Sequence, residues 1–175
     1  MSQRALETWL FGKMPALGDF VSRGLDQSMR ERLDTWLTRE MEMARAGAGD
    51  DFDRRFDAAP AWNYVDQDAD GRWIGGALCA SRDRSGRRFP LIMGATADDA
   101  RMAAARSAGC LSAMCRAFVE GWDADGLALA EVTPEDTGWQ PTGSEWALLA
   151  SAGPELVIPG RFPQGAITVM VEMAQ

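Results

Sequence analysis

The chain has 175 residues, of which 46% are hydrophobic and 25% charged, so it is long enough to bury one sizeable core. Its net charge of −8 disfavours nucleic acid or an anionic membrane surface as a partner. The chain contains no histidine, which excludes Ser/His/Asp and Cys/His catalysis and His-ligated metal sites. The chemistry that remains possible is that of carboxylate, Cys, Lys, Tyr or Arg side chains, and the charge balance favours protein partners or internal ion pairs.

The cysteines and the N-terminal segment bear on the compartment. Cys79, Cys110 and Cys115 lie among apolar neighbours without a CxxC spacing, so we interpret them as small buried residues in a reducing compartment. Glu7 occupies the place where a signal peptide needs its apolar stretch, and the sequence has no long uncharged apolar run. We expect a cytoplasmic protein with no segment inserted in a membrane.

The first predicted elements are a strand and a long helix. Residues 9–14 are mostly apolar and run into a turn, which is typical of a strand. Apolar residues then recur every three or four positions over residues 25–44, which predicts an amphipathic helix. Its predicted N-cap is Asp26 or Ser22. Its predicted end is Gly47 or Gly49, because the pattern fits both.

The middle of the chain predicts a sheet built from neighbouring strands. Residues 50–59 predict a short acidic helical turn that ends before a proline. Residues 62–65 and 73–80 predict two antiparallel strands joined by a polar loop. Residues 89–95 predict a further strand, which follows a second polar loop.

The remaining elements complete the predicted fold class. A capping motif followed by apolar residues at helical spacing predicts a long helix over residues 98–121. Residues 146–150 and 166–171 predict two late strands, the second because its apolar residues alternate. The sequence therefore predicts a single α+β domain over residues 1–175, with a mixed, largely antiparallel sheet packed with two main helices.

One acidic loop resembles the first half of a calcium-binding loop. Asp66, Asp68 and Asp70 alternate and are followed by a glycine. The twelfth position, where such a loop has a bidentate glutamate, is Ala77. We therefore interpret the loop as a solvated hairpin connection and keep these carboxylates only as a weak metal candidate; no cofactor is predicted.

Two other residues are possible functional positions. Asp19 lies between a glycine and Phe20, so it is the best candidate for a buried acid, with turn N–H groups or an arginine as its alternative partners. Trp139 lies in a polar stretch, where it would either contact a protein partner or fold over the protein's own core.

Three stretches resemble the TagF family, also called ImpM, which is associated with bacterial type VI secretion. Residues 11–21 read FGKMPALGDFV, residues 59–62 read APAW, and residues 75–91 contain GGAL followed by SRDRSGRRFPL. The last stretch carries Arg82 and Ser85 where the family usually has apolar residues, and Ala147 replaces an expected tryptophan. The resemblance covers residues 9–95 well, and the order of elements continues to about residue 150.

The resemblance implies a cytoplasmic accessory protein that restrains type VI secretion after translation. It implies a forkhead-associated scaffold protein of the secretion system as the partner. It implies no catalytic residue.

Two hypotheses assign roles to the resembling loops. In one, Asp19 accepts a bidentate bond from Arg87 or Arg88 and ties the loops together. In the other, the loops form the partner surface directly, with Lys13, Asp83 and Arg84 exposed. The candidate contact or structural residues are Lys13, Gly18, Asp19, Phe20, Asp83, Arg84, Gly86, Arg87, Arg88 and Trp139.

Three function classes follow from the sequence. The leading one is a non-enzymatic regulator that occupies a partner surface. The second is a structural, self-assembling component of the apparatus, with edge strands or the Trp139 region packed on other copies. The third is an enzyme that uses carboxylates or a metal at the loop from Asp66 to Asp70.

Overall fold

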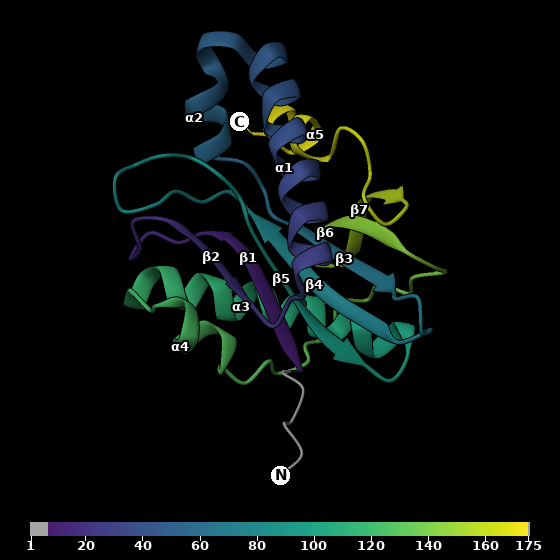
Figure 1. Cartoon of the computed structure of the whole chain (residues 1–175). Coiled ribbons are helices and arrows are strands. Elements are labelled where there is room, and N and C mark those ends of the chain that lie inside the picture. Colours follow the sequence, from purple (N-terminus) through teal and green to yellow (C-terminus); the bar gives the residue numbers. More distant parts are fainter. Residues whose placement is uncertain (1–6, 175) are drawn as a thin grey trace.

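A computed structural model describes residues 7–174, which form one continuous seven-stranded sheet with helices on both faces (Figure 1). The strand order is β2-β1-β5-β4-β3-β6-β7, and every neighbouring pair is antiparallel. The predicted α+β class is confirmed. The strands are β1 Thr8–Lys13, β2 Phe20–Arg23, β3 Trp62–Gln67, β4 Trp73–Cys79, β5 Leu91–Ala97, β6 Glu145–Ala150 and β7 Gly153–Pro159.

The helices divide between the two faces of the sheet. One face packs against α1 (Gln27–Ala48), α2 (Phe52–Asp57) and α5 (Ala166–Glu172), and a short 3-10 turn η1 (Gly49–Asp51) joins α1 to α2. The other face packs against α3 (Ala100–Glu120) and α4 (Ala124–Ala128). Successive strand residues serve opposite faces, as in β5, where Ile92 joins the α1 core and Met93 joins the α3 core.

Both long helices begin and end at local signals. The Asp26 side chain accepts a hydrogen bond from the backbone N–H of Met29 at 2.7 Å, and Gly49 ends α1 with φ +56°. Asp99 caps α3 in the same way through Met102, at 2.8 Å. The two predicted long helices are therefore confirmed. Of the alternatives proposed for the ends of the first helix, Asp26 and Gly49 are the ones found.

Adjacent glycines allow close packing on both faces of β4. A Cβ atom at Gly75 would overlap the backbone of Ala103 in α3, and one at Gly76 would overlap the Tyr64 ring. The Tyr64 hydroxyl reaches across β4 and donates to the carbonyl oxygen of Met93 at 3.0 Å. The glycine pair therefore has a packing role.

The predicted strand over residues 166–171 is wrong, because this segment is helix α5. Its buried Ile167, Met170 and Val171 recur at helical spacing against α1. The carboxylate of Glu40, which is buried on α1, accepts hydrogen bonds from the backbone N–H groups of Gly165 at 2.9 Å and Ile167 at 3.2 Å. A carboxylate at the first turn satisfies N–H groups that a helix cannot pair internally.

Three further elements had no prediction from the sequence: β2, β7 and α4. The strands β2 and β7 form the two edges of the sheet. The helix α4 is short and begins at Asp123, whose side chain accepts from the N–H of Gly126 at 2.8 Å.

We predict that Glu40→Ala lowers the free energy of unfolding by about 2 kcal/mol or more, because it leaves two N–H groups at the start of α5 without their charged acceptor. Urea denaturation measures the change. Glu42→Ala is the matched control on the same helix, because Glu42 is exposed, and we expect it to change stability by at most about 0.5 kcal/mol. Equal stabilities of the two variants would contradict the capping role.

Candidate functional site

The connections β1–β2 and β4–β5 lie side by side at one end of the sheet and form the paired loops, residues 14–19 and 80–90 (Figure 1). The backbone N–H of Arg84 donates to the carbonyl oxygen of Leu17 at 2.8 Å. The Arg87 guanidinium donates to the carbonyl oxygen of Gly18 at 2.8 Å. The Ser81 hydroxyl donates to the carbonyl oxygen of Lys13 at 2.7 Å. The two stretches that carry the family resemblance are thus one structural unit.

The carboxylate of Asp83 lies at the centre of this unit, and its side chain is fully buried. Its Oδ1 accepts from the backbone N–H and hydroxyl of Ser85, at 3.0 and 2.7 Å, and from the backbone N–H of Arg87 at 3.0 Å. Its Oδ2 lies 2.8 Å from Arg87 Nε and 3.0 Å from Lys13 Nζ. Gly86, with φ +88°, allows the chain to turn around the carboxylate.

Lys13 supplies the charge that comes from the other loop. It is the last residue of β1, and 6% of it is exposed. Its Nζ pairs with Asp83 and lies 5.0 Å from the centre of the Phe20 ring. The hypothesis that Lys13 and Asp83 are exposed contact residues is therefore wrong: both are buried in the unit that supports the surface.

The charge of Asp83 is strongly favoured by its surroundings. Burial by itself raises the pKa of this carboxyl group, because it removes the charged form from water. The hydrogen bonds from Ser85, Lys13 and Arg87 outweigh that effect and hold the pKa far below its ordinary value of 3.8. The group is therefore ionised at neutral pH and acts as a structural acceptor.

The predicted tie between Asp19 and an arginine is wrong. Asp19 is exposed, and its side chain accepts from the neighbouring N–H of Phe20 at 2.8 Å. Arg87 bonds to Asp83, and Arg88 reaches Asp57 of α2 at 2.7 Å. A tie between the loops exists, but the acid that makes it is Asp83.

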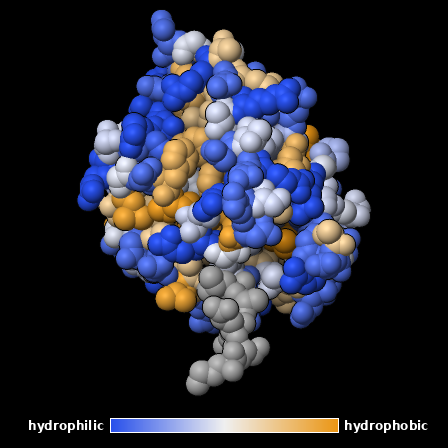
Figure 2. Space-filling view, in the orientation of Figure 1, coloured by the Kyte–Doolittle hydropathy of each residue, from blue (hydrophilic) through white to orange (hydrophobic). Residues whose placement is uncertain are grey.

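The outer side of the paired loops presents arginines and one aromatic ring. Phe20 is 46% exposed and rests against Phe89, with ring centres 4.9 Å apart. Arg82 and Arg84 are exposed on either side of buried Asp83. We call Phe20, Arg82 and Arg84 the rim. Figure 2 shows hydrophobic and strongly hydrophilic surface side by side over the flank where Figure 1 places these loops.

Trp139 is not an exposed contact residue. It is 4% exposed and packs with Val65, Ala103 and Ala147 beneath the segment that leads to β6. The alternative, a loop folded over its own core, is the arrangement found.

The carboxylates of the acidic loop do not converge on a metal site. Asp66 turns inward, where the Ser144 hydroxyl donates to it at 2.7 Å and Arg161 Nε lies 2.7 Å away. Asp68 accepts from the backbone N–H and Nε of Arg72, at 2.9 and 2.8 Å, while Asp70 is exposed. Across residues 7–174, no group of three or more His, Cys, Asp or Glu side chains is placed to hold a metal ion.

The cysteines differ in exposure. Cys110 is fully buried, and burial raises the pKa of its thiol to about 12. Cys79 is partly buried, and desolvation raises its thiol pKa further. Cys115 is exposed, so the prediction that all these cysteines are buried is wrong for this residue. Raised pKa values keep the thiols protonated and disfavour nucleophilic chemistry.

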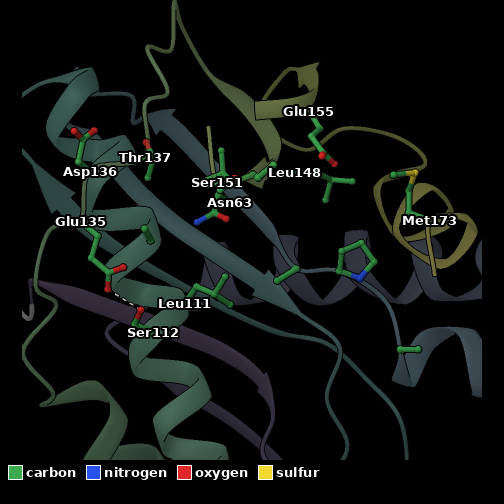
Figure 3. Close-up of a pocket in the computed structure, with 16 residues that line it drawn as sticks. Asn63, Leu111, Ser112, Glu135, Asp136, Thr137, Leu148, Ser151, Glu155 and Met173 are labelled. Atoms are coloured by element: carbon green, nitrogen blue, oxygen red, sulfur yellow. Dashed lines mark hydrogen bonds between the residues drawn. The ribbon is translucent and has the colours of Figure 1, made fainter. Parts of the chain in front are cut away.

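A cavity of about 750 Å³ lies between α3, β6, the end of α5 and the segment before β6 (Figure 3). Its polar groups come from separate elements and include Glu135, Ser112 and Glu155. The Ser112 hydroxyl donates to Glu135 at 2.7 Å, as the dashed line in Figure 3 marks. Nothing in this pair supplies a base for an activated nucleophile, because serine needs a stronger proton acceptor than an exposed carboxylate.

Comparison with known proteins assigns the family. Residues 9–135 match the TagF N-terminal domain, which is described as type VI secretion system-associated. The chain belongs to the TagF family. The match includes both paired loops, and the resemblance inferred from the sequence is confirmed. No curated protein sequence matches the chain significantly.

A solved structure shares the TagF fold of this chain. It is the crystal structure of PA0076 from Pseudomonas aeruginosa PAO1, which is 19% identical in sequence and superposes with a TM-score of 0.67. The match covers 94% of this chain and 93% of that one. The common fold therefore extends beyond residue 135 to include β6, β7 and α5.

The helices offer no membrane span. Within residues 7–174, no helix is both long and apolar enough to cross a bilayer.

We predict that Asp83→Asn destabilises the protein at pH 7, because it leaves the Lys13 charge buried without its partner. The native pKa of Asp83 is depressed, so its contribution is present above about pH 4 and is lost progressively as the pH falls below that value. Urea midpoints at pH 7, 5, 4 and 3 should show the difference from the wild type shrinking below pH 4. Asp19→Asn is the exposed control; a pH-independent difference for Asp83→Asn would contradict this role.

Proposed function

We propose that the chain is a non-enzymatic, cytoplasmic accessory protein that represses type VI secretion by binding the forkhead-associated scaffold protein of the system. Membership of a family associated with type VI secretion supports the setting. The observation that carries a binding role is the rim, which exposes an aromatic ring and two arginines on loops fixed from beneath by Asp83. Aromatic and arginine side chains are the residue types that dominate protein interfaces.

Within the paired loops, the buried polar side chains already have bonding partners, which favours a contact role over a catalytic one. The buried polar groups of Asp83, Lys13 and Ser81 already bond to each other or to backbone. A catalytic group needs an ionisable atom that is free to reach a substrate. The groups that remain available on the outer side of these loops are the guanidinium groups of Arg82 and Arg84, which serve as hydrogen-bond donors and fixed charges.

A binding regulator needs no chemistry of its own. A protein that binds the surface through which a scaffold assembles blocks that assembly. The fraction of scaffold that is blocked rises with the concentration of the binding protein relative to the dissociation constant of the complex. Fixed loops lose little conformational entropy on binding, which favours affinity for a given contact area.

The second candidate is a self-assembling component of the apparatus. The edge strand β7 supports it, because Leu156 and Val157 are 37% and 40% exposed there. Pro154 and Pro159 at its ends lack N–H groups and oppose extended pairing with another strand. Size-exclusion chromatography with mass detection separates the candidates: the regulator is expected as a single small species, and a stable high oligomer of the purified chain would favour assembly.

We predict that the tagged protein, purified by affinity from its native cytoplasm, brings the forkhead-associated scaffold with it, as mass spectrometry would detect. Deleting its gene should raise secretion, and expressing the wild-type chain should lower it again. Phe20→Ala should weaken recovery of the scaffold, because it removes the exposed ring, while Val119→Ala is a control at an exposed apolar position on α3. Abundant folded protein without scaffold would contradict the proposal.

A further inference from the structure

We propose that the rim docks a carboxylate-rich segment of the protein partner, in which an apolar side chain accompanies the acidic ones. This inference rests on the proposed function, which supplies the partner, and adds the chemistry of the segment that is recognised.

Two free guanidinium groups are the first observation. The β4–β5 connection carries Arg82, Arg84, Arg87 and Arg88 in a chain whose net charge is −8. Arg87 and Arg88 are paired with carboxylates of the protein itself. Within residues 7–174, the guanidinium groups of Arg82 and Arg84 make no hydrogen bond and no close ion pair, and Arg82 is attracted to Asp57 only at longer range.

The backbone beneath these two arginines is fixed. Arg82 forms a β-bridge with Arg88, and the N–H of Arg84 is bonded to Leu17. Between them, Asp83 points inward to its donors, so its neighbours are both exposed. A planar guanidinium on a fixed backbone is suited to bidentate bonding of a carboxylate, since only side-chain freedom is lost.

Apolar side chains lie near the arginines in two places. One is the exposed face of Phe20, which is held by Phe89. The other is a hollow of about 210 Å³ of mixed lining, where Pro15, Ala80 and Phe118 are the apolar members and Asp57, Ser81 and Arg82 the polar ones. The hollow is large enough for an apolar side chain next to a carboxylate bound by Arg82. An occupant that combines both kinds of group therefore fits better than a purely acidic one.

The acidic groups near the rim do not cancel its charge. Asp57 also lines the hollow, but Arg88 binds it bidentately, at 2.8 and 2.7 Å, and this pairing is the main cause of its lowered pKa, with a smaller contribution from the charge of Arg82. Asp19 is exposed beside Phe20 and bonds to its N–H. The total charge of −8 repels an extended polyanion, so a short segment with a few carboxylates is the occupant that charge complementarity selects.

Charge reversal with a matched control tests the inference. The Kd of the purified scaffold would be measured by calorimetry for the wild type, R82E/R84E and R30E/R39E. The control changes net charge equally at two exposed arginines of α1. We expect R82E/R84E to raise the Kd about tenfold or more and the control to change it by less than about twofold. Added salt should weaken wild-type binding more than binding by R82E/R84E.

Two further measurements keep folding and ligand chemistry separate. R82Q/R84Q removes the charges without adding repulsion. Its thermal midpoint and that of R82E/R84E should stay close to that of the wild type, because within residues 7–174 neither guanidinium group makes a hydrogen bond or a close ion pair, and the attraction of Arg82 to Asp57 is secondary to that of Arg88. A photo-crosslinking amino acid at position 20 should attach to a segment of the scaffold that contains acidic and apolar residues. Treating the scaffold with phosphatase should leave the Kd unchanged.

The outcomes are distinct. Failure of the wild type to bind scaffold would overturn the proposed function and this inference with it. Binding that R82E/R84E and R82Q/R84Q leave unchanged would overturn the inference alone. Loss of binding after phosphatase treatment, or a crosslink to a segment without carboxylates, would overturn the assignment of a carboxylate-rich occupant.

Discussion

The contact between Asp83 and Lys13 determines how the two family-defining loops are held. Burying an ion pair costs desolvation energy, and the pair is stable only when additional hydrogen bonds satisfy the carboxylate. Here Ser85 and Arg87 supply those bonds, so one side chain fixes a turn and attaches it to the end of β1. The position of the exposed arginines depends on this arrangement, because they flank Asp83 in the chain.

The sheet explains why these loops can meet. Strand β1 pairs with β5 in antiparallel register, so the connection that leaves β1 and the connection that enters β5 lie at the same end of the sheet. Their inner groups bond within the protein, while Phe20, Arg82 and Arg84 remain at the surface. The paired loops therefore have a structural interior and an exposed exterior that is open to contact.

The sequence predicts those parts of the fold that local signals control. Long apolar repeats follow Asp26 and the capping motif at residues 96–99, so both major helices could be placed, and the cap of the first was among the two proposed. Helix α5 could not, because its acceptor is Glu40, 125 residues before Gly165. Strand β7 was missed because it is an edge strand whose residues are mostly exposed and show no alternation.

The candidate site was located from its motifs, but the roles of its residues were not. Asp19 and Asp83 are the same residue type in similar loops, and only the folded structure shows that Asp83 is the one buried among hydrogen-bond donors. The polar residues around Trp139 in the sequence likewise do not show whether its side chain is exposed, and the structure shows that it is buried. In the sequence, Arg82 is distinguished only as a departure from the family pattern. That its guanidinium group lacks a close partner follows from the structure, in which Arg87 and Arg88 take the nearby carboxylates of Asp83 and Asp57.

Hydrogen exchange of the free protein and of its complex with the purified scaffold tests the central claim, that Asp83 holds a fixed surface used for binding. The account predicts slow exchange of residues 82–88 in the free protein and further protection of both paired loops in the complex. Rapid exchange of residues 82–88 in the free protein, or protection in the complex confined to other elements, would contradict it.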